Sequence, residues 1–251
     1  MTRVLLATTS FPENAHDWRG RFIADMMQAL AQRADIELRY WGPPGQLPAG
    51  VNAAMPAQDA AWLRELLQRG GIAHLLRQRG LFALPVVLEL LRRLRRAYLA
   101  SDAQLFHINW LQNALPMGRS RQPALITVLG SDLGLLRLPS MVRLLRFVLR
   151  GRRVLLAPNA DWMAPLLAEA FGDITEIRTI PFGIADAWFA VQRDYAAENR
   201  DWLAVTRLTP GKLGDLFAWG AGVFGPQRRL HLFGPRQDAS ITIPDWVHYH
   251  G

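Results

Sequence analysis

The sequence of 251 residues contains no cysteine, which excludes a disulfide scaffold and thiolate metal sites and is compatible with a reducing cytoplasm. No run approaches about 18 uncharged apolar residues, so no membrane-spanning helix is predicted. The chain turns polar too soon after Met1 for a signal peptide. It has no complete G-x-G-x-x-G motif and no carboxylate pair with an obvious metal-ligand spacing. We therefore expect no dinucleotide, no bound metal and no other cofactor.

Acidic residues are scarce in the middle of the chain. Residues 60–153 hold 16 arginines against four acidic residues, a net charge of +12, whereas residues 1–59 carry −1 and residues 154–251 carry −3, which sum to the +8 of the whole chain. The middle segment is therefore expected to meet an anionic partner such as lipid head groups, nucleic acid or an acidic glycan.

Short apolar runs alternate with segments of helical periodicity, which predicts an α/β fold with a doubly wound parallel sheet. We expect strands at 4–8, 36–41, 105–108, 125–129, 154–157, 177–180, 202–206, 230–233 and 246–249. We expect helices at 22–30, 60–68, 72–78, 84–98, 141–153, 162–171 and 212–219.

The same pattern predicts two domains. Residues 1–188 are expected to form an N-terminal Rossmann-like domain, residues 189–200 a linker, and residues 201–251 the beginning of a second Rossmann-like domain. A doubly wound domain needs several βα repeats before both faces of its sheet are covered. About fifty residues do not supply them, so we expect this second domain to be incomplete.

Arg207 and Lys212 flank a Pro-Gly turn between an expected buried strand and a helix expected to begin near Lys212. Helix amino termini carry unpaired N–H groups and positive dipole, so a diphosphate there would meet a guanidinium fork and an ammonium charge. The alternative is a solvated loop that carries two basic residues.

The loop that follows the first strand lies at the carboxyl edge, where open α/β sheets bind ligands. Asp17, Arg19 and Arg21 of this loop are candidates for contacting an acceptor or the donor phosphates, and Gly20 allows the backbone to come close. The alternative makes Asp17 a helix N-cap with both arginines in solvent.

Further candidates follow the later strands at the same edge. His107 and Asp132 are candidate catalytic or sugar-binding groups, and Asn109, Ser131 and Asn159 are candidate cleft residues. The alternatives are a buried histidine with its hydrogen bonds satisfied and, for the residues before helices, capping.

Two arginine-rich helical segments, 84–98 and 141–153, each combine an apolar stripe with a basic one. A solvated face is one explanation. A second, which we favour, is peripheral contact with an anionic membrane surface.

In order and spacing, the segments resemble the retaining family-4 glycosyltransferases of the GT-B fold. The matching pieces are Thr9–Pro12, Asp17–Phe22, His107–Trp110, Thr127–Asp132, Ala157–Met163, Ile180–Ile184 and Arg207–Lys212. Two departures stand out: Leu129 occupies the position where the family often has a histidine, and the family's acidic donor-binding motif has no counterpart.

The resemblance implies a hexosyltransferase that moves a sugar from a nucleoside-diphosphate sugar to a lipid-linked or polysaccharide acceptor in cell-envelope glycan synthesis. It implies a retaining, metal-independent reaction in which Arg207 and Lys212 clamp the leaving diphosphate. It also implies a cytoplasmic protein, peripheral on the inner face of the membrane. Two alternatives stay open: a non-catalytic acceptor- or partner-binding remnant of such an enzyme, and a basic nucleic-acid-binding module, which lacks a known reader motif here.

Overall fold

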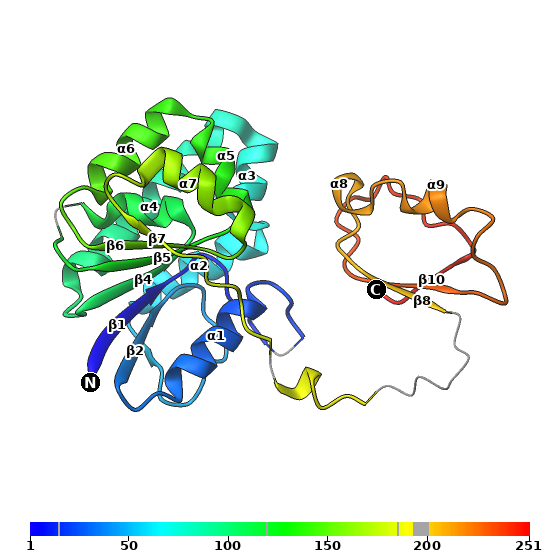
Figure 1. The fold of residues 1–251 in the computed structure, drawn as a ribbon, viewed down its shortest axis with the longest axis horizontal. Coiled ribbons are helices and arrows are strands. Elements are labelled where there is room, and N and C mark those ends of the chain that lie inside the picture. Colours follow the sequence, from blue (N-terminus) through cyan, green and yellow to red (C-terminus); the bar gives the residue numbers. More distant parts are fainter. Residues whose placement is uncertain (15, 119, 185, 193–200) are drawn as a thin grey trace. The chain divides into compact units, whose positions relative to one another are not determined.

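The computed structural model describes residues 1–14, 16–118, 120–184, 186–192 and 201–251. The chain divides into two compact units, Met1–Trp188 and Phe189–Gly251 (Figure 1). Of the expected linker at 189–200, residues 193–200 lie outside the described residues.

The strands agree with the expected positions within a few residues, apart from one short edge strand, β3, that periodicity did not predict. The strands are β1 (Thr2–Ala7), β2 (Ile36–Trp41), β3 (Asn52–Ala53), β4 (Leu105–Asn109), β5 (Ala124–Val128), β6 (Val154–Pro158), β7 (Glu176–Ile177), β8 (Trp202–Val205), β9 (Leu230–Phe233) and β10 (Val247–Tyr249). The α-helices are α1 (Arg21–Ala31), α2 (Ala57–Gln68), α3 (Gly71–Arg79), α4 (Leu84–Ala100), α5 (Leu133–Leu136), α6 (Pro139–Leu149), α7 (Ala164–Phe171), α8 (Pro210–Leu213) and α9 (Leu216–Gly220). Short 3₁₀ turns are η1 (Gly80–Ala83), η2 (Leu111–Met117), η3 (Gly130–Asp132), η4 (Asp161–Met163) and η5 (Asp186–Trp188).

The first unit is built on a seven-stranded sheet in the order β3-β2-β1-β4-β5-β6-β7. Every pair of neighbouring strands is parallel. The chain therefore moves outward from β1 to β2 and β3, then crosses back and continues on the other side of β1 from β4. Because such crossovers are right-handed, α1 lies on one face and α4, α6 and α7 lie on the other (Figure 1). This is the predicted doubly wound arrangement.

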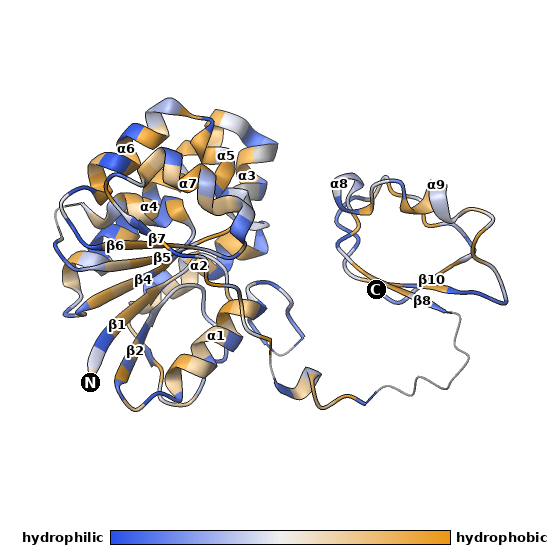
Figure 2. Cartoon of the chain, viewed as in Figure 1, coloured by the Kyte–Doolittle hydropathy of each residue, from blue (hydrophilic) through white to orange (hydrophobic). Residues whose placement is uncertain are grey.

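The alternation of side chains along β1 divides the core into two parts. Leu5 and Ala7 belong to the larger core under α4, α6 and α7, while Val4 and Leu6 pack against α1. The middle strands are mostly apolar (Figure 2), as expected of parallel strands inside a sheet.

The second unit has a three-stranded parallel sheet in the order β10-β9-β8. Both α8 and α9 contribute to a core on one face, around Leu213, Leu230 and Leu232. The alternate residues of β8 point the other way, so Leu203 and Val205 are 68% and 74% exposed. The prediction of a buried strand at 202–206 is therefore wrong for this face, because both described helices of the unit pack on the opposite side.

Two expected helices and one expected strand have different boundaries in the structure. The helix expected at 212–219 is two short helices, separated at Gly214, whose φ of 52° does not continue a right-handed helix. The helix expected at 141–153 begins at Pro139 and ends at Leu149, before Gly151 with φ of 81°. The strand expected at 177–180 pairs only over Glu176–Ile177.

Candidate functional site

The strand order creates a switch point between β1 and β4. The connections after these two neighbouring strands leave toward opposite faces of the sheet, and open α/β sheets bind ligands at the carboxyl ends of strands at such a switch point. The residues that follow β1 and β4 are therefore the first place to look for a site in this unit.

Polar side chains gather at this switch point. The Thr8 hydroxyl donates to the carbonyl oxygen of Ser10 at 3.0 Å and holds the start of the loop after β1. After β4, Nδ2 of Asn113 donates to the carbonyl oxygen of Asn109 at 2.7 Å and lies 3.5 Å from the hydroxyl of Thr9. The two loops are thus tied together by neutral polar groups, which suit hydroxyl-bearing ligands.

Asn109 is the unusual member of this group. Its side chain is fully buried, yet neither Oδ1 nor Nδ2 has a hydrogen-bond partner among the described residues. A buried polar group without a partner costs about 1–3 kcal/mol, so such groups are uncommon unless a water or a ligand satisfies them. The next residue, Trp110, has φ of 70° and is the one non-glycine residue of the described chain with positive φ. Backbone strain of this kind concentrates at functional sites.

An aromatic row links three separate segments beside the switch point. The Trp110 ring lies edge-on to Phe22 of α1, with centroids 6.2 Å apart, and Phe22 lies 4.5 Å from Phe182. The segment 180–184 is thereby brought to the side of the first unit where β1 and β4 end.

The loop before α1 is organised by an ion pair. Asp17, whose side chain is 8% exposed, forms two hydrogen bonds with the Arg19 guanidinium, at 2.9 and 3.0 Å, and accepts a third from the N–H of Glu13 at 3.1 Å. Burial alone would raise the pKa of Asp17, but these hydrogen bonds and the charge of Arg19 outweigh it and lower the pKa. Asp17 is therefore not a helix N-cap: that position is Gly20.

Gly20 and Arg21 have distinct structural roles. Gly20 has φ of 68°, and a Cβ there would lie 2.8 Å from the backbone of Ser10, so only glycine lets the two ends of the loop meet. Arg21 is the first residue of α1 and pairs with Asp25 at 3.1 Å. Of the four predicted loop residues, Asp17 and Arg19 stabilise the loop through their ion pair, and Gly20 allows its two ends to come together. Arg21 belongs to α1.

His107 lies inside the sheet. Its Nε2 is 3.0 Å from the hydroxyl of Thr127 on the neighbouring strand, and the imidazole is buried. Burial lowers the pKa of His107 to about 4, which keeps the ring neutral. This geometry is that of a buried histidine with a hydrogen-bond partner.

Asp132 is buried as well and ties two loops together. Its Oδ2 accepts hydrogen bonds from the N–H groups of Leu129 at 3.0 Å and Leu111 at 3.2 Å. Burial raises the pKa of Asp132 to about 6 in spite of these bonds. Ser131 is exposed, and the N–H of Asn159 donates to the carbonyl oxygen of Val128 at 3.2 Å. Asp132 thus joins the loops after β4 and β5 at the carboxyl edge.

In the second unit, Arg207 and Lys212 are both exposed and lie in the connection that follows β8. The helix begins at Pro210 after Thr209, and the N–H of Lys212 donates to the carbonyl oxygen of Thr209 at 3.0 Å. The helix expected to begin near Lys212 begins at Pro210, two residues earlier, so Lys212 lies within its single turn and its backbone N–H is already bonded to Thr209.

Sequence reasoning missed three histidines of the second unit. His231 Nδ1 lies 2.9 Å from His250 Nε2, and the His231 ring stacks on His248 with centroids 5.3 Å apart. Adjacent parallel strands produce this cluster, and no local motif marks it. Within the described ranges, no group of three or more His, Cys, Asp or Glu side chains has an arrangement that could hold a metal ion.

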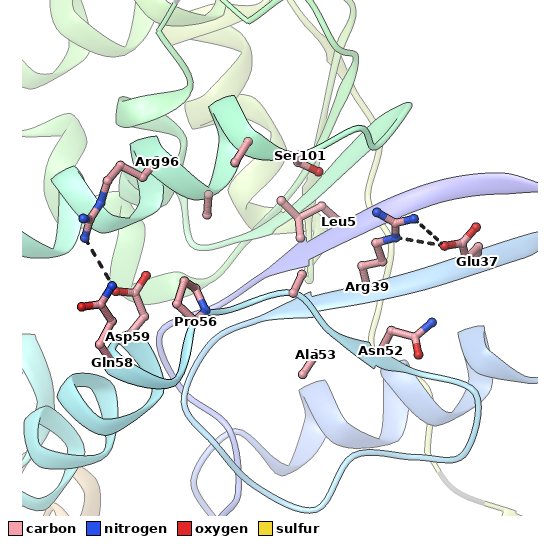
Figure 3. A pocket seen from close by; sticks show the side chains of 13 residues that line it. Leu5, Glu37, Arg39, Asn52, Ala53, Pro56, Gln58, Asp59, Arg96 and Ser101 are labelled. Atoms are coloured by element: carbon pink, nitrogen blue, oxygen red, sulfur yellow. Dashed lines mark hydrogen bonds and ion pairs between the residues drawn. The ribbon is translucent and has the colours of Figure 1, made fainter.

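A cavity of about 540 Å³ lies away from the switch point, between β2, β3 and the last turns of α4 (Figure 3). Its arginines are already paired, Arg39 with Glu37 at 2.8 Å and Arg96 with Asp59 at 3.7 Å. The cavity borders the start of β2 rather than the carboxyl edge of the sheet. We therefore place the candidate site at the switch point and not in this cavity.

No model of a known protein family matches the sequence, and no curated protein matches it. Among solved structures, the chain is similar to sucrose-phosphate synthase from Thermosynechococcus elongatus, with 14% identity and a TM-score of 0.55 over 96% of this chain and 64% of that one. It is also similar to HepE from Anabaena in complex with UDP, with 14% identity and a TM-score of 0.51 over 94% and 61% of the two chains. The complex of HepE with UDP and glucose gives 12% identity and a TM-score of 0.51 over 93% and 61%.

These similar structures are GT-B glycosyltransferases, and the likeness covers nearly the whole chain. The predicted α/β, GT-B-like fold is thereby confirmed. The chain spans less than two thirds of the length of those structures.

Proposed function

We propose that this chain functions in glycosyl transfer from a nucleoside-diphosphate sugar. The observation that carries the proposal is the switch point of a GT-B-like first unit. There the buried amide of Asn109 has no hydrogen-bond partner among the described residues, and Nδ2 of Asn113 lies between the Asn109 carbonyl oxygen and the Thr9 hydroxyl. The occurrence of UDP in a similar structure supports a nucleotide as the donor's leaving group.

The first unit is proposed to bind the acceptor. Carboxamide and hydroxyl groups can donate to and accept from sugar hydroxyls without carrying charge. Asp132 holds the loops after β4 and β5 in register, while Ser131 and Asn159 lie at the same edge and are proposed cleft residues. We propose that the loop between β1 and α1, held in shape by the Asp17–Arg19 ion pair, borders the acceptor. Gly20 and Arg21 lie at the end of this loop.

The second unit is proposed to hold the donor diphosphate through Arg207 and Lys212. At about 4 Å each charge pair with a phosphate oxygen is worth roughly 4 kcal/mol at an effective dielectric of about 20. Two such cations would stabilise the negative charge that develops on the leaving diphosphate, which is the main task in this reaction. On this basis we propose a reaction that needs no metal ion. From the resemblance to the retaining family-4 glycosyltransferases alone, we propose that it also retains the anomeric configuration.

The finer biological setting is also a proposal. A lipid-linked or polysaccharide acceptor of the cell envelope, and a cytoplasmic location on the inner membrane face, would suit the basic middle segment. No helix in the described part of the chain has both the length and the apolar content to cross a bilayer.

A test of the donor site can exploit the fact that Lys212 is the chain's single lysine. An amine-selective reagent should modify Lys212 and the amino terminus, and UDP should protect Lys212 but not the terminus, as read by peptide mass spectrometry. Arg207→Ala and Lys212→Ala should each weaken UDP binding in calorimetry by about tenfold or more, since hydrogen bonds to charged groups are worth about 1.5–3 kcal/mol. Arg228→Ala is the matched control, because this exposed arginine precedes β9 at the opposite edge of the same sheet.

Sugar transfer itself is tested by mass spectrometry of products formed from a panel of sugar nucleotides, with and without EDTA. A product formed equally in EDTA, whose anomeric configuration by NMR is that of the donor, supports the proposed reaction. UDP binding unchanged in Arg207→Ala and Lys212→Ala would remove the donor-site assignment. UDP binding without any product would favour the non-catalytic alternative.

A further inference from the structure

A groove runs along α1 on the flank that faces the loop after β2. Its volume is about 460 Å³, which lies within the range of about 300–1,000 Å³ typical of pockets that hold small ligands. Its helical side extends from Arg21, the first residue of α1, to Gln32, directly after the last one. At about 1.5 Å per residue this is about 16 Å, so the groove, which we name the α1 groove, is elongated.

The α1 groove is separate from the switch point. Phe22, which contacts Trp110 beside the switch point, is two residues before Ala24 and six before Gln28. Residues at these spacings project from different flanks of a helix, whereas Ala24, Gln28 and Ala31 follow one another at four and three residues and share a flank. The groove therefore gives the first unit a second place to bind a ligand.

The wall opposite α1 is fixed by contacts within the first unit. The loop after β2 approaches the loop after β1 so closely that a Cβ on Gly45 would lie 2.2 Å from the carbonyl oxygen of Pro12. The Tyr40 hydroxyl donates to the carbonyl oxygen of Pro43 at 2.7 Å, and Leu47 packs against the same core as α1. A ligand would therefore meet a preformed wall, which lowers the entropy that binding costs.

Carboxamides dominate the polar lining of the α1 groove. Gln28, Gln32 and Gln46 are exposed, and none of these side chains has a hydrogen-bond partner among the described residues. Arg21 and Asp25, the two charged residues of the lining, pair with each other at 3.1 Å. The groove thus offers neutral groups that both donate and accept hydrogen bonds, and it carries no net charge.

This lining selects the class of ligand. An ion would gain little from a groove whose two charges already pair with each other. A peptide would need a sheet edge or pockets for large apolar side chains, but the wall is a loop and most apolar residues of the lining are alanine and proline. The hydroxyls of a sugar both donate and accept, as carboxamides do, so a row of carboxamides along a helix matches a chain of sugars.

We propose that the α1 groove binds an uncharged oligosaccharide through Gln28, Gln32 and Gln46. The proposal rests on the proposed function, because glycosyl transfer makes a sugar chain the expected ligand among hydroxyl-rich molecules. It goes beyond that function in two respects: the bound glycan has more than one sugar unit, and these units carry no charge. The lining contains no residue of the basic middle segment, 60–153.

Side-chain amide signals in ¹⁵N NMR test the proposal on the whole chain. Titration with neutral hexasaccharides of glucose, mannose, galactose and N-acetylglucosamine should shift the signals of Gln28, Gln32 and Gln46 with at least one of them, whereas the acidic hexagalacturonate should not. Gln28→Ala with Gln46→Ala should weaken binding of the neutral glycan by about tenfold, a few-fold for each carboxamide. Gln78→Ala with Gln227→Ala is the matched control, because both residues are exposed and lie outside the groove.

The changed side chains are exposed, so the circular dichroism of both double variants should match that of the parent. Neutral-glycan binding that is weakened in the groove variant and kept in the control supports the proposal. The proposal is overturned if no neutral glycan shifts these signals, if the control loses binding equally, or if the acidic glycan binds better. Failure of the proposed function has a different signature, the absence of UDP binding and of product, and the groove variant should bind UDP as the parent does.

Discussion

The opposite pKa shifts of two buried groups in the first unit make a sharp prediction about stability. Burial lowers the pKa of His107 from 6.5 to about 4. Burial raises the pKa of Asp132 from 3.8 to about 6, against the hydrogen bonds from Leu129 and Leu111. The folded protein favours the neutral form of both side chains. The resulting changes in the free energy of unfolding fall between about pH 4 and pH 6.5.

The two effects have opposite signs. Because folding lowers the pKa of His107, its stabilisation is present above pH 6.5 and is lost as the pH falls toward 4, a change of about 3 kcal/mol at about 1.4 kcal/mol per pH unit. Because folding raises the pKa of Asp132, its stabilisation is present below pH 3.8 and is lost as the pH rises toward 6, again by about 3 kcal/mol. In the unmodified chain the two changes nearly cancel.

Single substitutions should expose each effect. Asp132→Asn keeps a side-chain oxygen for the N–H of Leu129 but does not titrate, so its free energy of unfolding should rise relative to the parent's by about 3 kcal/mol from pH 4 to pH 6.5. His107→Gln keeps a polar group near Thr127 and should show a fall of similar size. Urea unfolding followed by near-ultraviolet circular dichroism measures both. The comparison with the parent removes the contribution of exposed carboxylates, which all three proteins share.

The burial argument would be refuted if the free energy of unfolding of each variant changed with pH as that of the parent does. If Asp132→Asn and the parent change equally with pH, the carboxyl group is not held neutral by burial, and its hydrogen bonds from backbone N–H groups dominate instead. If His107→Gln also follows the parent, the imidazole titrates as it does in the unfolded chain.

Two further substitutions test the description of the core and the switch point. Asn109→Leu should raise the free energy of unfolding by about 1–2 kcal/mol in urea unfolding, because it removes a buried amide that has no hydrogen-bond partner in the described part of the chain. A loss of stability would mean that a buried water satisfies the amide. Asp59→Asn should lower the free energy of unfolding by about 1–3 kcal/mol, because it removes a charge-assisted hydrogen bond between two largely buried side chains while Arg93 keeps its ion pair with Glu89. Glu176→Gln at an exposed pair should change it little, and equal effects of these two substitutions would contradict the role of burial.

Both the sequence pattern and the tertiary structure were needed to locate the candidate site. The alternation of apolar runs and helical periods placed the edge of the sheet where Asn109 and Asp132 occur, because parallel strands present their carboxyl ends together. Three features were not predictable: the side-chain amide of Asn109 has no hydrogen-bond partner among the described residues, Asp132 joins two loops, and Trp110 has positive φ. Each depends on atoms contributed by another strand.

The errors of prediction have the same origin. The apolar residues on both sides of Gly214 follow one helical period, yet Gly214 ends the first helix. Strand β3 has two residues, which is too few to show any period. The sequence predicted one basic stripe along α4, yet Arg92 and Arg93 pair with Glu89. Periodicity reports which side of an element is apolar, not which charges find partners.

By itself, the sequence determined the α/β class, most strand and helix positions, and the basic middle segment. These follow from local spacing and composition, which any conformation of the chain retains. Only the tertiary structure decided which polar groups are paired, which are buried without partners, and which apolar side chains, such as Leu81 and Phe82, stay in solvent. Those properties arise from the order of the strands and the packing between them, which bring together residues that lie far apart along the chain.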